Sequence, residues 1–279
     1  MRIAGIPRSP EHSPNMSDKD MLLLREISEK LRKKGHTVEI PDNSNALEGY
    51  DAIFHMSRSA ETLSRLAECE KRGIPVTNAT AGVRNCSRKN FMEILRRNGI
   101  RQPAYSTVTP STDTTTLKYP GWMKKSEGWS SHIDDVQFVA SPEEADKALQ
   151  RLAARGCDTA IYSEHVKGDL IKFYGVCVTD FFRHHYPDPE TTKFGLERIN
   201  GKAARHPFDH NLLKRMTFRA AQALQTEVFG GDCIVTPEGE IYIIDMNDFP
   251  SFSAYRQEAA EAIAHAIENP TSGNERIRP

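Results

Sequence analysis

The sequence contains no long hydrophobic run and no excess of charge of either sign. In its 279 residues no apolar segment approaches the roughly 20 residues that a membrane-spanning helix needs. Lysine and arginine together number 37, and aspartate and glutamate number 38, which leaves a net charge of -1. This balance gives no reason to expect a nucleic acid or an anionic membrane as a partner.

Cysteine is also scarce, and the residues that are present form no CxxC pair. The five cysteines are Cys69, Cys86, Cys157, Cys177 and Cys233. We expect reduced thiols in a cytoplasmic protein, without a cysteine-based metal site. Residues 1–7 lack the long apolar core and the cleavage site of a signal peptide, so we expect none. The composition, with 38% hydrophobic residues, predicts a globular chain and leaves a homo-oligomer open.

The first hundred residues alternate between short apolar segments and amphipathic ones. Gly35 and Gly73 each follow an amphipathic segment, where glycine commonly ends a helix. The alternation predicts a small parallel sheet. Its strands are expected at Arg2–Ile6, Thr37–Ile40, Asp51–His55 and Ile74–Thr77, and the helices at Lys19–Lys34, Ala60–Arg72 and Ser87–Asn98.

The pattern changes after Ser106–Lys118, a stretch rich in Ser and Thr that is predicted to be a loop or linker. A second polar loop, Ser126–His132, is expected between two strands and could close over phosphates, although it contains a single glycine. Its Trp129 is either a lid or a packed side chain. We expect strands at Tyr119–Lys125, Val136–Val139, Thr159–His165 and Leu170–Thr179, and helices at Pro142–Arg155, Asp209–Thr226 and Ser253–Glu268.

Two apolar runs near the C-terminus predict a hairpin that ends in acidic and amide side chains. The turn Thr236–Glu240 joins them, with Pro and Gly in turn positions. Asp245 and Asn247 are two residues apart, so on a strand they face the same side, and the hairpin can bring Asp232 beside them. Hard oxygen ligands of this kind suit Mg²⁺, which leaves the rest of its shell to water and substrate phosphates. The alternative is a hairpin with polar strand ends.

The order of these elements resembles the ATP-grasp superfamily over nearly the whole chain. The most specific match is Gly231-Asp232 followed by Asp245-x-Asn247, where the family carries the Mg²⁺ ions that bridge the ATP phosphates. The family usually has Glu at the middle position. The inositol trisphosphate kinase branch also uses Asp there, followed by Asn-x-Phe-Pro.

The resemblance implies an α/β ATP-grasp fold. A small N-terminal parallel α/β domain, residues 1–85, would precede two α+β subdomains that clasp ATP between them. We expect these subdomains at residues 86–165 and 166–279, the second of which contains the metal hairpin. The implied cofactors are ATP and one or two Mg²⁺ ions.

The resemblance also implies roles for residues in the segment Ser163–Val176. The backbone near Glu164, His165 and Val166 would read the adenine edge, Asp169 would bind the ribose hydroxyls, and Lys172 would reach the phosphates or the phosphoryl acceptor.

Two further cations are expected at the phosphates. Arg88 stands where the family has its first phosphate-binding basic residue, with Lys89 as the alternative. Lys124 matches the lysine that contacts the α- and β-phosphates. Lys125 stays open, because a shift of one residue reverses the face of a strand. A triphosphate carries about four negative charges, and its transfer needs spaced cations and Mg²⁺ to neutralise them.

The acceptor is less defined by the sequence. Arg198 is expected to take part in catalysis with Lys172. Arginine and histidine bind either carboxylates or phosphates, so we expect a small-molecule or peptide acceptor that carries a carboxylate or a hydroxyl. Other candidates are Arg183, His184, His185, Arg205, His206, Ser251, Ser253, Tyr255 and Arg256.

We expect a carboxylate–amine ligase similar to the ribosomal-protein glutamyl ligase (RimK-like) branch, which acts through an acyl phosphate. A small-molecule kinase similar to inositol trisphosphate kinase is the first alternative, favoured by Leu170–Tyr174 and Ile244–Pro250. A nucleotide-binding protein without chemistry is the second alternative. An intact set of three metal ligands argues against it.

Overall fold

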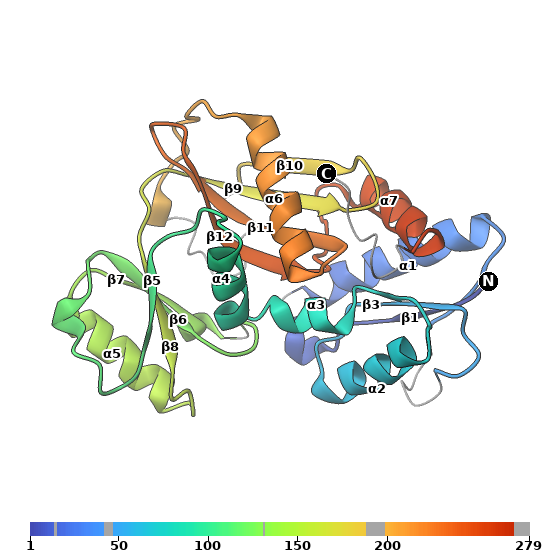
Figure 1. Ribbon diagram of the computed structural model, residues 1–279, viewed down its shortest axis with the longest axis horizontal. Coiled ribbons are helices and arrows are strands. Elements are labelled where there is room, and N and C mark those ends of the chain that lie inside the picture. The colour runs from blue at the N-terminus through green and yellow to red at the C-terminus, as the bar shows by residue number, and fades with distance from the viewer. Residues whose placement is uncertain (14–15, 42–46, 131, 188–198, 271–279) are drawn as a thin grey trace.

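The computed structural model of the chain describes residues 1–13, 16–41, 47–130, 132–187 and 199–270. Within them the chain forms three four-stranded sheets, each with helices packed on it. Figure 1 shows them as three lobes, with helices α3 (Thr80–Asn85) and α4 (Arg88–Arg97) near the centre. The α/β class expected from the sequence is confirmed.

The N-terminal sheet is parallel throughout, as the alternation of segments predicts. Its order is β2-β1-β3-β4, and the bounds agree with the expected ones to within two residues. The elements are β1 (Arg2–Ile6), α1 (Ser17–Lys33), β2 (Thr37–Glu39), β3 (Ala52–His55), α2 (Ala60–Lys71) and β4 (Val76–Thr77).

The second sheet is antiparallel, with the order β5-β8-β6-β7 and helix α5 (Pro142–Ala153) packed on it. Its strands are β5 (Tyr105–Val108), β6 (Gly121–Lys125), β7 (Val136–Val139) and β8 (Ala160–Glu164). The sequence predicted a loop from Ser106, and this was wrong for the first three residues. Tyr, Thr and Val favour a pleated strand once β8 supplies a partner.

The third sheet is also antiparallel, with the order β10-β9-β11-β12. Helices α4 and α6 (His210–Leu224) share its apolar core. The sequence did not predict β10, which forms the edge of the sheet. The strands are β9 (Asp169–Val176), β10 (Phe182–His185), β11 (Val228–Val235) and β12 (Ile241–Asp248).

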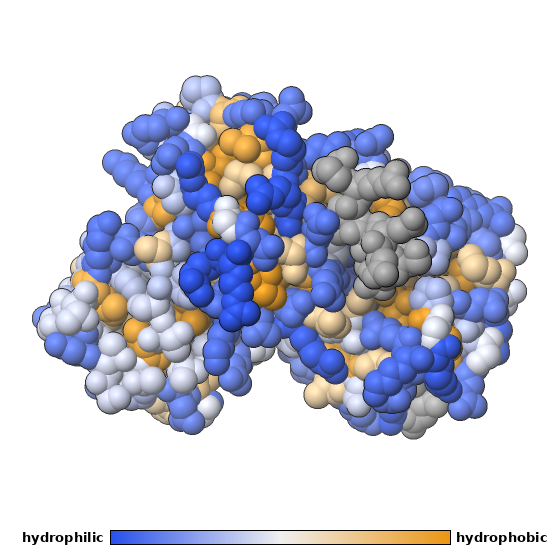
Figure 2. All heavy atoms as spheres, viewed as in Figure 1, coloured by the Kyte–Doolittle hydropathy of each residue, from blue (hydrophilic) through white to orange (hydrophobic). Residues whose placement is uncertain are grey.

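The last helix, α7 (Arg256–Glu268), returns to the N-terminal unit and packs on α1. Figure 1 shows the two helices side by side, although α1 is blue and α7 is red because they come from opposite ends of the chain. The expected domain boundaries stay a prediction, because α7 and α4 both share cores with elements on the other side of a boundary. None of the helices described is both long and apolar enough to cross a membrane. The face in Figure 2 is mainly hydrophilic, with scattered apolar patches and an indented outline between the β5–β8 lobe and the N-terminal lobe.

Candidate active site

A cavity of about 300 Å³ lies between the second and third sheets. Residues from β6 and β8 line one side, and residues from β9, β11 and β12 line the other. The cavity gathers nearly every residue that the sequence assigns to ATP or metal, although these residues are spread over more than half of the chain. They are Arg88, Lys124, Glu164, His165, Val166, Lys172, Asp232, Asp245 and Asn247.

The register of the third sheet explains how the metal residues meet. Asp232 on β11 pairs with Lys172 on β9 and with Asp245 on β12, so the three side chains form a row across one face. Lys172 Nζ lies 3.2 Å from Asp232 Oδ1. The register of the β11–β12 hairpin shifts between Asp232 and Cys233, directly beside the row of Lys172, Asp232 and Asp245.

The three predicted metal ligands, Asp232, Asp245 and Asn247, are called the metal trio below. Asn247 Nδ2 donates to Asp245 Oδ2 at 3.1 Å, while Asn247 Oδ1 accepts no hydrogen bond from any described residue. The described residues contain no group of three His, Cys, Asp or Glu side chains that could hold a metal ion. The trio has two carboxylates and one amide. Mg²⁺ needs few protein ligands of this kind, so the donor set fits it.

Two cations face the metal trio from the other side of the cavity. Arg88, at the start of α4, donates to the carbonyl of Lys125 and to Ser130 Oγ, each at 3.2 Å. Lys124 is buried and lines the cavity, whereas Lys125 does not. Burial, together with the neighbouring Arg88 charge, lowers the pKa of Lys124 to about 8. Of the two lysines left open by the sequence, the structure therefore brings Lys124 to the site.

The segment after β8 forms the third wall. The N–H groups of Glu164 and His165 donate to the carbonyls of Ala104 and Pro120, at 2.9 and 3.0 Å. His165 Nδ1 accepts from Trp122 Nε1 at 3.1 Å, which fixes the ring, and burial lowers the pKa of His165.

Known proteins resemble this chain in structure but not in sequence. No family model matches the chain, and neither does any curated protein. Among solved structures, D-alanine–D-alanine ligase from Bacillus anthracis matches with a TM-score of 0.68 and 17% identity, over 96% of both chains. The same ligase complexed with ATP matches with a TM-score of 0.65 and 16% identity, also over 96% of both. A RimK domain ATP-grasp protein from Sphaerobacter thermophilus DSM 20745 matches with a TM-score of 0.70 and 14% identity, over 96% of this chain and 100% of that one.

The chain has the ATP-grasp fold. The match covers all three sheets, since it extends over 96% of the chain. At these identities the similarity shows the fold and leaves the roles of individual residues to be argued from the geometry.

Two predicted residues of the ATP-grasp site are not in the cavity as described. Asp169 is only 3% exposed, and its two carboxylate oxygens accept the N–H groups of Ala204 and His206, both at 2.7 Å. This geometry gives Asp169 a structural role, and its expected contact with ribose stays a prediction. Arg198 lies outside the described residues.

The acceptor candidates also lie away from the cavity. Arg183 pairs with Glu258, and His184 Nε2 lies 2.9 Å from His210 Nδ1. His185 is stacked on Tyr174. None of the other described candidates lines the cavity: Arg205, His206, Ser251, Ser253, Tyr255 and Arg256.

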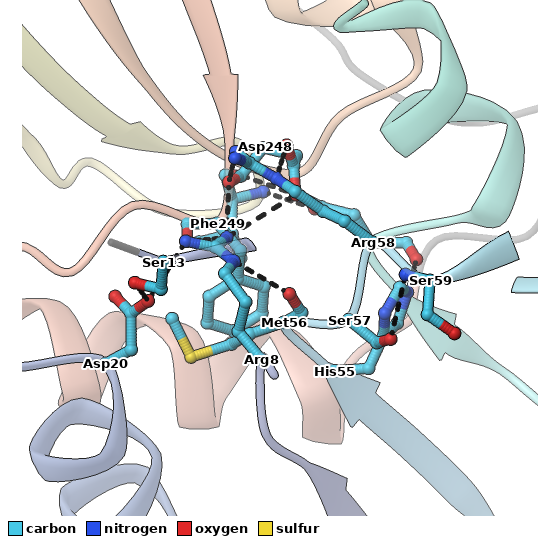
Figure 3. A network of polar contacts seen from close by, with 12 residues as sticks. Arg8, Ser13, Asp20, His55, Met56, Ser57, Arg58, Ser59, Asp248 and Phe249 are labelled. Carbon is cyan, nitrogen blue, oxygen red and sulfur yellow. Dashed lines mark hydrogen bonds and ion pairs between the residues drawn. The ribbon is translucent and has the colours of Figure 1, made fainter. Parts of the chain in front are cut away.

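Sequence reasoning missed Arg58, which reaches the cavity of this ATP-grasp fold from the N-terminal sheet. Arg58 follows β3 and binds the Asp248 carboxylate through Nε and Nη2 (Figure 3). The available signal was its place just after a predicted strand, because ligands of α/β sheets commonly bind beyond the carboxyl ends of the strands.

Proposed function

We propose that the chain is an ATP- and Mg²⁺-dependent ligase that joins a carboxylate to an amine through an acyl phosphate. The observation that carries this proposal is one cavity in which Arg88 and Lys124 face the metal trio and Lys172 lies beside it. Spaced cations and oxygen ligands for Mg²⁺ are what the transfer of a phosphoryl group needs. The Bacillus anthracis ligase complexed with ATP supports ATP as the nucleotide.

The adenine of ATP would lie against the segment Glu164–Val166. Since the N–H groups of Glu164 and His165 already donate within the protein, Val166 is the residue whose N–H can meet the adenine edge. Trp122 and Leu170 line the same part of the cavity and provide apolar surfaces for a flat base. The phosphates would then extend toward Lys124 and Arg88.

The metal trio would hold Mg²⁺ against the β- and γ-phosphates. Bound there, the ion would neutralise charge on the phosphates. Asp245 and Asn247 are placed to act together, because their side chains touch. Asp232 would exchange its contact with Lys172 for the metal, and Lys172 would become available to the transferring phosphoryl group.

In the first step a carboxylate oxygen of the acid substrate attacks the γ-phosphorus of ATP. The bond to the β,γ-bridging oxygen breaks, and ADP leaves with the electron pair. In the second step the amine nitrogen attacks the acyl carbon, phosphate leaves, and the nitrogen loses a proton. The arrangement of Arg88, Lys124 and Lys172 supports the first step, since each places positive charge beside the phosphates.

Ligase chemistry is favoured over the kinase alternative by the structural neighbours, which are named as ligases or as a RimK domain protein. Within the proposal, assignment to the RimK-like branch is more specific than assignment to the ligases. The kinase alternative keeps the support of the sequence Asp245-Met-Asn-Asp-Phe-Pro250. All five cysteines are free thiols, which supports a cytoplasmic location.

The test is incubation of the protein with ATP, Mg²⁺ and a panel of amino acids, short peptides and inositol phosphates, with products identified by mass. A condensed product with release of free phosphate supports the ligase. A product that contains phosphate would establish the kinase instead. Binding of ATP with no product from any member would favour the non-catalytic alternative. The matched control is Asp245→Asn, which keeps the shape of the site and removes one metal ligand charge.

A further inference from the structure

Arg58 connects the N-terminal sheet to the ATP-grasp cavity. It stands between β3 and α2, at the carboxyl edge of the parallel sheet, and lines the cavity. Figure 3 shows its side chain extending to Asp248, the last residue of β12. The side chain is only 7% exposed.

One edge of the Arg58 guanidinium is occupied, and another is not. Nε and Nη2 donate to Asp248 Oδ1 at 2.9 and 2.7 Å. Nη1 donates no hydrogen bond to any residue that the structure describes. Asp248 therefore holds the guanidinium in one orientation and leaves two N–H donors of a buried side chain unused.

A second donor belongs to Trp129, whose ring lies against the Arg58 guanidinium. Arg58 Cζ lies 4.9 Å from the centroid of the Trp129 ring, which also lines the cavity. Trp129 Nε1 is buried and has no hydrogen-bond partner within the described part of the chain. An unsatisfied buried donor costs roughly 1–3 kcal/mol. Trp129 Nε1 is such a donor. Together with Nη1 of Arg58, which has no partner among the described residues, it points to a ligand that accepts hydrogen bonds.

Arg8, in the same cluster, shows the contrast. Its Nε donates to the Met56 carbonyl at 2.9 Å, its Nη1 to Asp20 at 3.2 Å, and its Nη2 to the Phe249 carbonyl at 2.9 Å (Figure 3). Arg8 does not line the cavity. All three nitrogens of Arg8 thus have partners in the protein, and Nη2 joins the N-terminal unit to the end of β12. Arg58 instead keeps one nitrogen for the cavity.

The place of Arg58 along the third sheet indicates which part of the reaction it serves. The start of β9 adjoins the expected adenine segment, and Asp232 and Asp245 pair further along the sheet. Asp248 follows Asp245 by about 10 Å, at roughly 3.3 Å per residue of strand. Along the sheet, the expected sites for adenine, the phosphates and the metal therefore come first, and Arg58 comes last. The group that receives the phosphoryl must lie at this last position.

We infer that Arg58 Nη1 and Trp129 Nε1 bind a carboxylate of the acid substrate at this end of the cavity. The inference rests on the proposed function, since it names the acceptor subsite of the same reaction. A carboxylate offers oxygen acceptors to both donors, and a charged acceptor makes the stronger hydrogen bond to a guanidinium.

The test uses the optical signal that the site contains. The chain has two tryptophans, so Trp122→Phe leaves Trp129 as the single indole beside Arg58. This protein is titrated with N-acetylglycine and, as the uncharged match, with N-acetylglycinamide, at constant ionic strength, while Trp129 emission is recorded. The titration is repeated in Arg58→Gln, Arg58→Lys and Arg8→Gln. Arg8→Gln is the matched control, because it removes a guanidinium from the same cluster without reaching the cavity. Arg8 Nη2 also lies 3.6 Å from Asp248 Oδ2, so this variant measures how far a change around Asp248 alone affects binding.

We expect a saturable change with N-acetylglycine and none with the amide. Binding should weaken roughly tenfold or more in both Arg58 variants, the loss expected for a hydrogen bond to a charged group, and stay close to the parent in Arg8→Gln. Thermal unfolding of each variant is measured in parallel. Arg58→Lys keeps a cation for Asp248, so the test survives even if Arg58→Gln fails to fold.

Equal binding in folded Arg58 variants, or no saturable change at all, would overturn the inference. The titration is also run with a non-hydrolysable ATP analogue and Mg²⁺ at saturation. If the analogue abolishes the response, the two donors bind nucleotide phosphate and the acceptor assignment is wrong. The affinity of the analogue is measured separately on the wild-type protein, because Trp122 itself lines the expected adenine site. If the analogue does not bind at all, the proposed function fails. If the analogue binds but the Trp129 response to N-acetylglycine does not depend on Arg58, only the inference is wrong.

Discussion

Lys172 Nζ lies 3.2 Å from Asp232 Oδ1, so the cation proposed to stabilise the transferring phosphoryl group is paired with a proposed metal ligand. Both side chains are about one quarter exposed, at 25% and 24%, which allows water to screen the pair. ATP and Mg²⁺ would have to separate them, because the metal and the amine compete for the same carboxylate.

We expect Lys172→Met to lower turnover on the order of a hundredfold or more, since it removes a charge that acts on the transition state. Thermal stability should change little, because water screens this partly exposed pair and it contributes little to folding. Turnover and unfolding temperature are measured together. Lys89→Met is the control, since Lys89 is exposed on α4 and does not line the cavity. Wild-type turnover in Lys172→Met would leave Lys172 as a partner of Asp232 and nothing more.

A second prediction concerns Asp245, which touches Asn247 and pairs in register with Asp232. Asp245→Asn keeps the shape of the side chain and removes one charge, so the fold should survive while Mg²⁺-dependent turnover collapses. Asn247→Ala removes a neutral ligand and should cost less. Turnover is measured against Mg²⁺ concentration for both variants. A larger loss in Asn247→Ala than in Asp245→Asn would contradict the assignment.

The fold could be predicted to a large extent because most strands are buried on one or both faces. Segments such as the hairpin runs carry apolar residues that a sheet must cover, and their bounds follow from sequence alone. β5 and β10 are edge strands: β5 exposes Ser106 and Thr107, and β10 consists of half-buried Phe, Arg and His residues. Their extended form depends on pairing with β8 and β9, and the local sequence does not contain that information.

A third prediction concerns the pH dependence of ATP binding. The pKa of Lys124 is about 8, so the ammonium is largely charged at pH 7 and largely neutral at pH 9. Phosphates nearby would raise this pKa, so binding above pH 8 takes up a proton. Affinity should therefore fall as pH rises, by at most about tenfold per pH unit.

Titration of ATP between pH 7 and 9.5 measures this effect. Lys124→Arg serves as the control, because a guanidinium keeps its charge throughout that range. The fall in affinity should be absent from this variant. A fall of the same size in Lys124→Arg would show that another group titrates.

A fourth prediction separates the two roles of Asp169. If its carboxylate holds the N–H groups of Ala204 and His206, Asp169→Asn places an amide donor against them and should destabilise the protein by about 2 kcal/mol. The affinity for ATP should change little. Urea unfolding and ATP titration are measured on the same preparation. Unchanged stability together with a marked loss of ATP affinity would restore the ribose contact that the sequence suggested.

The site was predictable where local spacing places side chains, and not where distant segments meet. Asp245 and Asn247 share a face because they are two residues apart. The backbone groups that bind Asp169 come from 35 and 37 residues further along the chain. The Arg58 contact with Asp248 joins residues 190 positions apart. Lys124 could not be separated from Lys125 because the choice depends on which face of β6 the cavity takes.

A fifth prediction tests how the adenine is read. The Glu164 carboxylate is bound to Lys118 at 2.9 Å, and the expected contacts with adenine come from the backbone. Glu164→Ala should therefore weaken ATP binding only modestly. The loss should not exceed roughly 1 kcal/mol, which is the most that an exposed ion pair such as the one with Lys118 contributes. Lys118→Ala breaks the same pair from outside the cavity, so it measures what the pair alone contributes. The two variants should bind ATP with similar affinity, measured by titration. A loss in Glu164→Ala that Lys118→Ala does not share, tenfold or greater, would mean that the carboxylate itself contacts the nucleotide. The backbone reading of adenine would then be wrong.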